Sequence, residues 1–141
     1  MVVQQISVFL ENKYGKLSDI FALLAQNNIN ILATTVADTS EYGILRMLVS
    51  DPEGAIRALR NANVSTNLTE VFALELEHTS GSLAKVLKDF TDGGLSIEYI
   101  YCFSMMEKSV LVLRTSNKDA AREVIRRQGL KTVDQSSITI Y

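Results

Sequence analysis

Alternating hydrophobic and polar positions open the chain. Ile6, Val8 and Leu10 are separated by single residues, a period of two that predicts a strand with one buried face. After Gly15, apolar residues recur three and four positions apart, which predicts one stripe of an amphipathic helix. This stripe consists of Leu17, Ile20, Phe21 and Leu24. The chain is therefore expected to begin with a strand and a helix.

The following residues predict two strands, a second helix and a further strand. Residues 29–37 and 44–49 are strand-like, and 41–43 form the turn between them. The Asp-Pro-Glu sequence at 51–53 supplies a cap, a first-turn proline and an acidic first-turn residue, with which helices commonly begin. A fourth strand is expected after Asn63. The buried stripe of the second helix would be Ala55, Ile56 and Leu59.

The same pattern returns at a constant offset of 66 residues. Residues 1–75 lie over 67–141 without a gap, and 11 of the 75 aligned positions are identical, about twice what average residue usage predicts. Leu10, Glu11, Gly15 and Leu17 fall on Leu76, Glu77, Gly81 and Leu83. Since apolar positions coincide as well, the chain is interpreted as one fold used twice.

The second half predicts the matching elements. Its strands are expected at 72–76, 95–103, 110–115 and 133–140, and its helical stripes are Leu83, Val86, Leu87 and Phe90, then Ala121, Val124 and Ile125. The order strand, helix, strand, strand, helix, strand gives an antiparallel sheet with both helices on one face, the ferredoxin-like arrangement. We therefore predict an α+β protein of two βαββαβ units, residues 1–69 and 70–141. Because no Pro/Gly/Ser-rich linker separates them, the units are expected to pack side by side.

Charge and hydropathy exclude two classes of partner. Lys and Arg number 14 and Asp and Glu 16, a formal net charge of −2, so the basic excess typical of nucleic-acid binding is missing. The first residues lack the basic start and long apolar stretch of a signal peptide, and no later window is apolar enough to cross a bilayer. We expect a cytoplasmic protein that binds neither nucleic acid nor membrane.

Residues for catalysis or metal binding are sparse. His78 is the single histidine and Cys102 the single cysteine, so neither has a second residue of its type for a metal site or a disulfide. No nucleophile elbow, phosphate-binding glycine loop or dinucleotide fingerprint occurs. The chain is expected not to be an enzyme and to hold no metal or cofactor. Cys102 lies in an apolar run and is expected to be a buried, inert thiol.

Three aromatic residues raise the possibility of RNA binding. Tyr99, Tyr101 and Phe103 share one face of a predicted strand, as the stacking aromatics of RNA-binding modules do. Their counterparts in the first half are Ala33, Thr35 and Ala37. Because these are not aromatic and the surrounding charge is not basic, packing is the favoured interpretation.

A turn between the first strand and the first helix occurs in both halves. It reads Leu-Glu-Asn-Lys-Tyr-Gly-Lys-Leu at 10–17 and Leu-Glu-His-Thr-Ser-Gly-Ser-Leu at 76–83. A glycine just before a helix allows a tight turn and leaves the first backbone N–H groups without partners, so the helix start attracts a carboxylate. Alternatively, the glycine serves only to make the turn.

These turns, together with Asn-Asn-Ile-Asn-Ile at 27–31 and Gly-Leu-Ser-Ile at 94–97, resemble the ACT domain, a small regulatory module that binds amino acids in many biosynthetic enzymes. The two copies account for nearly the whole chain. The resemblance implies a tandem ACT protein without a catalytic domain and with a free amino acid as its ligand.

The resemblance also implies ligand contacts from each turn and from the start of the second strand of a neighbouring ACT unit. In the first copy these positions are Asn12, Lys13, Tyr14, Gly15, Lys16, Leu17 and Asn30. In the second copy they are His78, Ser80, Gly81, Ser82, Leu83 and Ser96. The family often has proline before the turn glycine, whereas this chain has Tyr14 and Ser80, which predicts a turn that is less rigid or shaped around another side chain.

The chemistry of an amino-acid ligand agrees with these residue types. A zwitterion needs acceptors for its ammonium group and donors for its carboxylate, and asparagine offers both. Asn30 could instead be a turn former after the helix, and His78 could line the site or lie in a solvated loop. If His78 lines the site, affinity would depend on pH.

The expected function is that of a small-molecule sensor. A free amino acid bound where two ACT units meet, within the chain or between two chains, would change their orientation and act allosterically on a separate enzyme or transcriptional partner. A homodimer is expected because open sheets leave edges and one face to cover. The alternative is a ligand-free structural or regulatory subunit of a biosynthetic enzyme complex.

Overall fold

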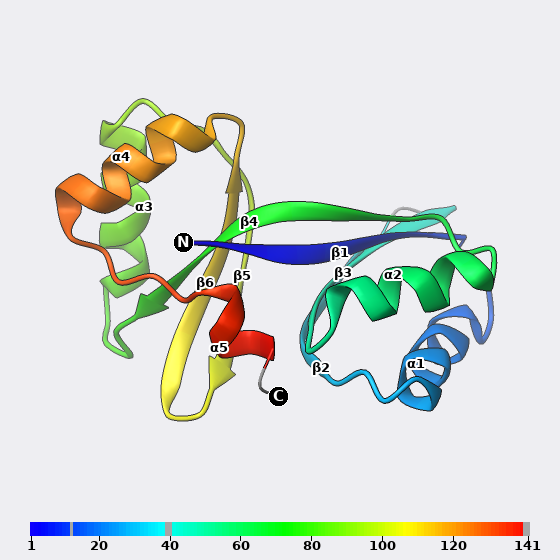
Figure 1. Ribbon diagram of the computed structural model, residues 1–141. Helices are drawn as coiled ribbons and strands as arrows, with labels where there is room; N and C mark the ends of the chain where they lie inside the picture. Colours follow the sequence, from blue (N-terminus) through cyan, green and yellow to red (C-terminus); the bar gives the residue numbers. More distant parts are fainter. Residues whose placement is uncertain (12, 39–40, 140–141) are drawn as a thin grey trace. The chain divides into compact units, whose positions relative to one another are not determined.

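The computed structural model describes residues 1–11, 13–38 and 41–139 (Figure 1). These residues fall into two compact units: Gln4–Thr69 with Ser136–Tyr141, called the N-terminal unit, and Met1–Val3 with Glu70–Gln135, called the C-terminal unit. In order, the elements are β1 (Val2–Glu11), α1 (Lys16–Gln26), β2 (Ile31–Asp38), β3 (Tyr42–Val49), α2 (Pro52–Asn61), β4 (Thr66–Leu76), α3 (Ser82–Asp92), β5 (Ile97–Met105), β6 (Lys108–Thr115), α4 (Lys118–Gln128) and α5 (Gln135–Thr139).

In the N-terminal unit, β3 is antiparallel to β1 on one side and to β2 on the other. Ile6 lies opposite Met47 and Val8 opposite Leu45, so the alternation of the strands directs these four side chains to one face. Helices α1 and α2 cover that face. The resulting core consists of Ile6, Val8, Leu10, Ile20, Leu24, Ile29, Leu45, Met47, Val49, Ala55, Ile56 and Leu59.

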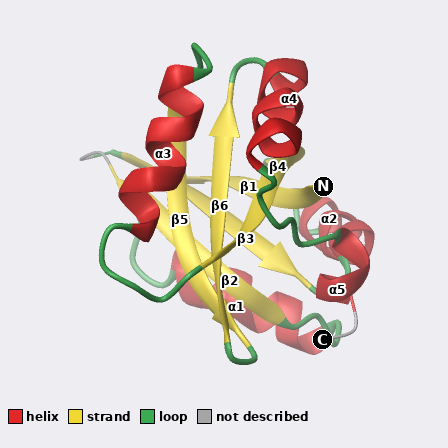
Figure 2. Cartoon of the chain, turned by 90° about the vertical axis from the view of Figure 1, so that its left-hand side faces the viewer, coloured by secondary structure: helices red, strands yellow, loops and turns green. Residues whose placement is uncertain are grey.

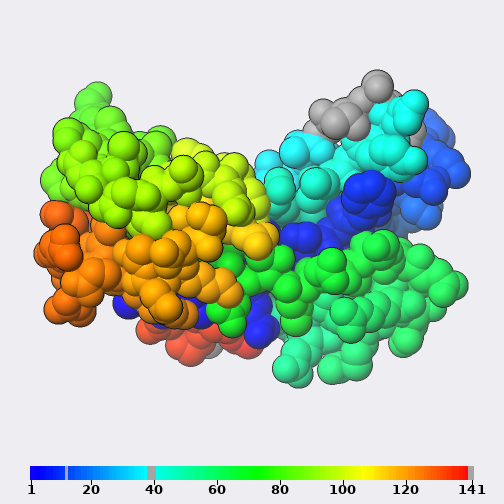
Figure 3. All heavy atoms as spheres, turned by 90° about the horizontal axis from the view of Figure 1, so that it is seen from above, coloured from blue at the N-terminus to red at the C-terminus, as the bar shows by residue number. Residues whose placement is uncertain are grey.

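The C-terminal unit repeats this arrangement with β6 between β4 and β5. Figure 2 shows α3 and α4 on one face of these strands, and in Figure 3 the surfaces of α3 (light green) and α4 (orange) adjoin. After α4 the chain returns beside β4, where the Val133 N–H donates to the Ala73 carbonyl at 2.8 Å. The core consists of Phe72, Leu74, Val86, Phe90, Leu95, Leu111, Leu113, Ala121, Val124 and Ile125.

The four longer helices begin in two different ways. Gly15 precedes α1 with φ 79° and Gly81 precedes α3 with φ 84°, both left-handed and without a side-chain cap. This conformation strongly favours glycine. At α2 and α4, the side chains of Asp51 and Asn117 instead accept a backbone N–H at 3.0 Å, which is ordinary N-capping. The glycine start therefore marks the helix after the first strand of each copy.

The predicted α+β class and the two ferredoxin-like units are confirmed. The strand predicted at 133–140 is wrong, because α5 occupies Gln135–Thr139; Thr132, before this range, forms an isolated bridge to Leu74. Residue 140 lies outside the described residues. Three consecutive polar residues at 135–137 interrupt the alternation that a strand needs, and the short helix buries Ile138 instead. The predicted turn at 41–43 is also too long, since β3 already includes Tyr42 and Gly43.

The burial expected for Cys102 is wrong, because this side chain is exposed. Cys102 lies opposite Leu111 on β6, and β5 has no second partner among the described strand pairings. The position is therefore at a sheet edge. Partial burial nevertheless raises the pKa of the Cys102 thiol, which disfavours the reactive thiolate.

Within the described ranges, no helix has the length and hydrophobicity that crossing a bilayer requires.

Candidate functional site

The turn between β4 and α3 is held by hydrogen bonds of its own. The Ser82 hydroxyl donates toward the carbonyl oxygens of Glu77, at 2.6 Å, and Thr79, at 2.9 Å. The Ser82 N–H also donates to the Thr79 carbonyl at 3.3 Å. With Gly81 in the left-handed conformation, these bonds fix the path of the chain into the helix.

The first turn of α3 presents backbone donors. The Lys85 N–H donates to the Gly81 carbonyl at 3.0 Å, but the N–H groups of Leu83 and Ala84 meet no acceptor within the described part of the chain. Such groups carry the partial positive charge of a helix start. They can therefore bind an anionic group that approaches this turn.

A cleft of about 710 Å³ lies beside this turn in the C-terminal unit. Its walls come from the end of β4, the turn itself, the first turn of α3, the β5–β6 hairpin and the segment after α4. The lining residues are Glu75, Leu76, Glu77, His78, Thr79, Ser80, Gly81, Ser82, Lys85, Val86, Glu107, Lys108, Ser109, Gln128, Gly129, Leu130 and Lys131. Three carboxylates and three lysines thus line one cleft, which suits a small molecule with charges of both signs.

Glu75 of β4 contacts two other walls of the cleft, β6 and the segment after α4. Its carboxylate accepts from the Lys108 Nζ at 2.6 Å, and its N–H donates to the Lys131 carbonyl at 2.9 Å. The hydrogen bond from Lys108, with the charges of Lys108 and Lys131, lowers the pKa of Glu75. The carboxylate therefore stays ionised and joins β4 to β6, while the backbone N–H joins β4 to the segment after α4.

His78 belongs to the turn, and its ring reaches β6. Its Nδ1 lies 3.4 Å from the Ser109 Oγ, so this ring joins the turn to the hairpin wall. His78 is exposed and also lines the cleft.

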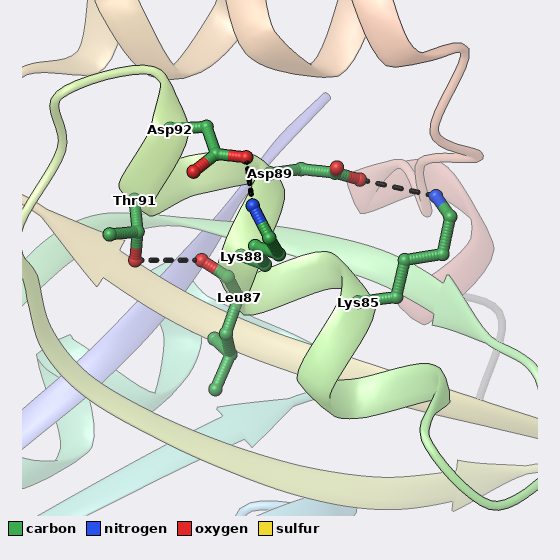
Figure 4. A network of polar contacts seen from close by, with 6 residues as sticks. All are labelled: Lys85, Leu87, Lys88, Asp89, Thr91 and Asp92. Carbon is green, nitrogen blue, oxygen red and sulfur yellow. Dashed lines mark hydrogen bonds and ion pairs between the residues drawn. The ribbon is translucent and has the colours of Figure 1, made fainter.

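The outer face of α3 carries two lysine–carboxylate pairs four residues apart (Figure 4). Lys85 lies 3.3 Å from Asp89, and Lys88 lies 2.6 Å from Asp92. The Thr91 hydroxyl donates to the Leu87 carbonyl at 3.0 Å. Lys85 is 70% exposed and also lines the cleft.

The second-copy predictions divide into two groups. His78, Ser80, Gly81 and Ser82 all line the cleft. Leu83 instead packs against the hydrophobic core. Ser96 lies just before β5, exposed and outside the cleft lining. The structure therefore brings together the polar part of the predicted site.

The first-copy predictions are more dispersed. Lys13 is exposed and pairs with Glu11 at 2.6 Å, and Tyr14 is fully exposed. Gly15 makes the turn, and Leu17, two residues later, is also exposed. Lys16 lines a groove of about 330 Å³ along α1.

Two predicted residues of the first copy are amides. Asn12 lies outside the described residues. Asn30 is exposed, and its backbone N–H donates to the Ser50 Oγ at 2.9 Å while its carbonyl accepts from the Ser50 N–H. These bonds join Asn30 to the residue that follows β3, and Asn30 does not line the groove along α1.

The sequence interpretation missed all six charged residues of the cleft, including Glu77 in the turn and Glu107 in the β5–β6 hairpin. Glu75, Lys85, Lys108 and Lys131 come from four different segments. Their charge is visible in the sequence, but their convergence depends on the sheet pairing and on the return of the chain after α4. One available signal was the spacing of Lys85 from Ser82, which places both residues on one side of a helix.

No group of three or more His, Cys, Asp or Glu residues is placed to hold a metal ion among the residues that the structure describes. The cleft offers ion-pair and hydrogen-bond partners for a small polar molecule.

The family model described as ACT domain pair matches residues 1–140. The crystal structure of protein BT0572 from Bacteroides thetaiotaomicron is 37% identical, with a TM-score of 0.93 over 100% of this chain and 98% of that one. The regulatory subunit of aspartate kinase from Thermus thermophilus, in ligand-free form, is 18% identical, with a TM-score of 0.62 over 92% and 95%. That from Thermus flavus is 17% identical, with a TM-score of 0.57 over 89% and 91%.

At these low identities the two Thermus subunits show the fold alone, and no curated protein sequence matches the chain. The match of the family model over nearly the whole length decides the assignment: this chain belongs to the ACT domain pair family.

Proposed function

We propose that this protein is a regulatory protein that binds a free amino acid in the cleft of its C-terminal unit. The observation that carries the proposal is the cleft itself, which lies at the glycine turn where the family resemblance expects ligand. The aspartate kinase neighbours are regulatory subunits, which is consistent with a regulatory role for an ACT pair.

The charges of the cleft support a zwitterionic ligand. Lys85 and Lys131 line the cleft, and a lysine ammonium group suits a carboxylate. Glu77 and Glu107 are carboxylates on its wall and suit an ammonium group. A ligand with both groups can satisfy both kinds of partner, whereas a simple ion leaves one kind unmatched.

The regulated partner would be a separate protein. We infer that ligand binding changes the orientation of ACT units and that an enzyme or a transcriptional regulator responds to it. The homodimer, the cytoplasmic location and the completion of the site by a neighbouring ACT unit stay predictions.

A thermal-shift screen of the twenty amino acids tests the proposal. A ligand at 100 times its dissociation constant stabilises the folded state by about 2.7 kcal/mol, which is readily detected as a rise in melting temperature. If no amino acid raises the melting temperature at millimolar concentration, the sensor proposal is wrong, and the ligand-free regulatory subunit becomes the better account.

A further inference from the structure

The two copies of the glycine turn differ in whether their glutamate already has an ammonium partner. In the N-terminal unit, Glu11 pairs with the Lys13 Nζ at 2.6 Å. The counterpart of Glu11 at the 66-residue offset is Glu77, and that of Lys13 is Thr79, which has no charge. Within the described part of the chain, the Glu77 carboxylate has no ion-pair or hydrogen-bond partner.

Lys13 therefore places an ammonium group beside Glu11, and an amino-acid ligand would bring the same chemical group. Its amine and the Glu11 carboxylate are separated by a single residue along the sequence, which gives this ammonium an effective concentration in the millimolar range. The pair lowers the pKa of Glu11 and raises the pKa of Lys13, so both groups stay charged at neutral pH. A free amino acid must compete with this tethered amine at the N-terminal turn, but not at the C-terminal turn.

The other carboxylates of the cleft do not distinguish the copies in this way. Glu75 is held by Lys108 at 2.6 Å. The counterpart of Glu107 is Glu41, so both copies have a glutamate at this position. Glu77 differs from both, because its counterpart in the N-terminal unit, Glu11, already forms an ion pair with Lys13.

We infer that Glu77 binds the ammonium group of the ligand in the C-terminal unit, and that Lys13 closes the equivalent position of the N-terminal unit by occupying Glu11. The inference rests on the proposed function and deepens it. It predicts one ligand per chain, bound through a primary ammonium group.

Calorimetric titration tests the ammonium contact. The probes are the amino acid that gives the largest shift in the screen and its deamino carboxylic acid. Glu77→Gln should weaken binding of the amino acid about ten- to a hundredfold, the value of a charge-assisted hydrogen bond, while binding of the deamino acid changes by less than a factor of about three. The matched variant Glu11→Gln should leave amino-acid affinity unchanged. Equal losses for both probes, or a larger loss in Glu107→Gln, would overturn the assignment.

Exchanging the tethered amine tests the second half of the inference. Thr79→Lys should place an ammonium group beside Glu77 and weaken binding at least about tenfold more than Thr79→Met, which adds length without charge. Lys13→Thr should open the N-terminal turn and raise the stoichiometry from one ligand per chain to two, whereas Lys13→Arg should not. An unchanged stoichiometry in Lys13→Thr, with the wild-type protein still binding, overturns the inference and leaves the proposed function standing. Absence of binding in the wild-type protein overturns both.

Discussion

The glycine turns at 11–16 and 77–82 share their backbone but not their charges. Gly15 and Gly81 have φ values of 79° and 84°, and the helices that follow are equally long. In the first turn Glu11 pairs with Lys13. In the second, the Ser82 hydroxyl donates to the Glu77 backbone carbonyl, and the Glu77 side chain has no ion-pair partner among the described residues. Among the described residues, the same backbone turn thus carries a paired glutamate in one unit and an unpaired glutamate in the other.

A second pair of equivalent positions differs in the same way. Phe9 and Tyr42 stack with ring centroids 5.1 Å apart, whereas their counterparts Glu75 and Lys108 form an ion pair at 2.6 Å. Both are diagonal pairs between neighbouring strands, which are close enough for long side chains to meet. The repeat therefore preserves the core pattern and the helix starts, while the side chains around each turn set its chemistry.

The largest predicted effect concerns the two cores. Phe90 and Leu24 are equivalent at the 66-residue offset and are both fully buried. Phe90→Ala should lower the free energy of unfolding by about 4 kcal/mol and Leu24→Ala by about 3 kcal/mol. Urea unfolding followed by circular dichroism measures both values. A smaller loss for Phe90→Ala would mean that the C-terminal core collapses around the cavity.

The next effect concerns the glycine turns. A Cβ at Gly15 or Gly81 meets no atom within 4 Å, so alanine there should cost only the left-handed strain, about 1 to 2 kcal/mol in each unit. Stability should fall equally, but ligand affinity should fall only in Gly81→Ala. Equal affinity losses in both variants would show that both turns bind.

The capped helices provide a contrast with the glycine starts. Asp51→Ala and Asn117→Ala each remove the acceptor for a backbone N–H at the start of α2 or α4, and each should cost about 1 kcal/mol. Asp51→Asn and Asn117→Asp should retain most of the stability, because the new side chains can also cap. Chemical denaturation of the four variants measures the difference, and an equal loss in the alanine and the capping variants would contradict the assigned caps.

The smallest effect concerns acid titration. The pKa of Glu75 is lowered chiefly by the hydrogen bond from Lys108, so this pair contributes stability above the ordinary carboxyl pKa and loses it as pH falls through the lowered pKa. In the N-terminal unit the stacked pair Phe9 and Tyr42 has no carboxyl group to titrate. Lys108→Met should raise the pKa of Glu75, measured by carbon NMR of the carboxyl group. An unchanged titration would show that Lys108 does not hold Glu75 in solution.

Periodicity predicted most of the fold because each long element buries one regular stripe. The stripe Leu83, Val86, Leu87 and Phe90 gives α3, for example, and its two most buried members are Val86 and Phe90. The last predicted strand failed because the polar residues 135–137 leave too few alternating positions, so a short helix buries Ile138 more effectively. Local pattern decides an element only where it persists over several turns or pleats.

The candidate site was predictable only in its local part. The turn residues His78, Ser80, Gly81 and Ser82 are close in sequence and were found from one motif. Lys108 and Lys131 reach the same cleft through the strand order and the return of the chain after α4. Such long-range convergence has no periodic signature in a single sequence.

The most direct test of the account is to map the ligand by amide chemical shifts. Isotope-labelled protein would be titrated with the amino acid selected in the thermal-shift screen. The account predicts the largest shifts at 77–85 and 107–109, with those at 13–19 and 41–44 remaining near zero. Shifts centred on 13–19, or shifts of equal size in both turns, would contradict the claim that the C-terminal cleft is open and the N-terminal turn is closed.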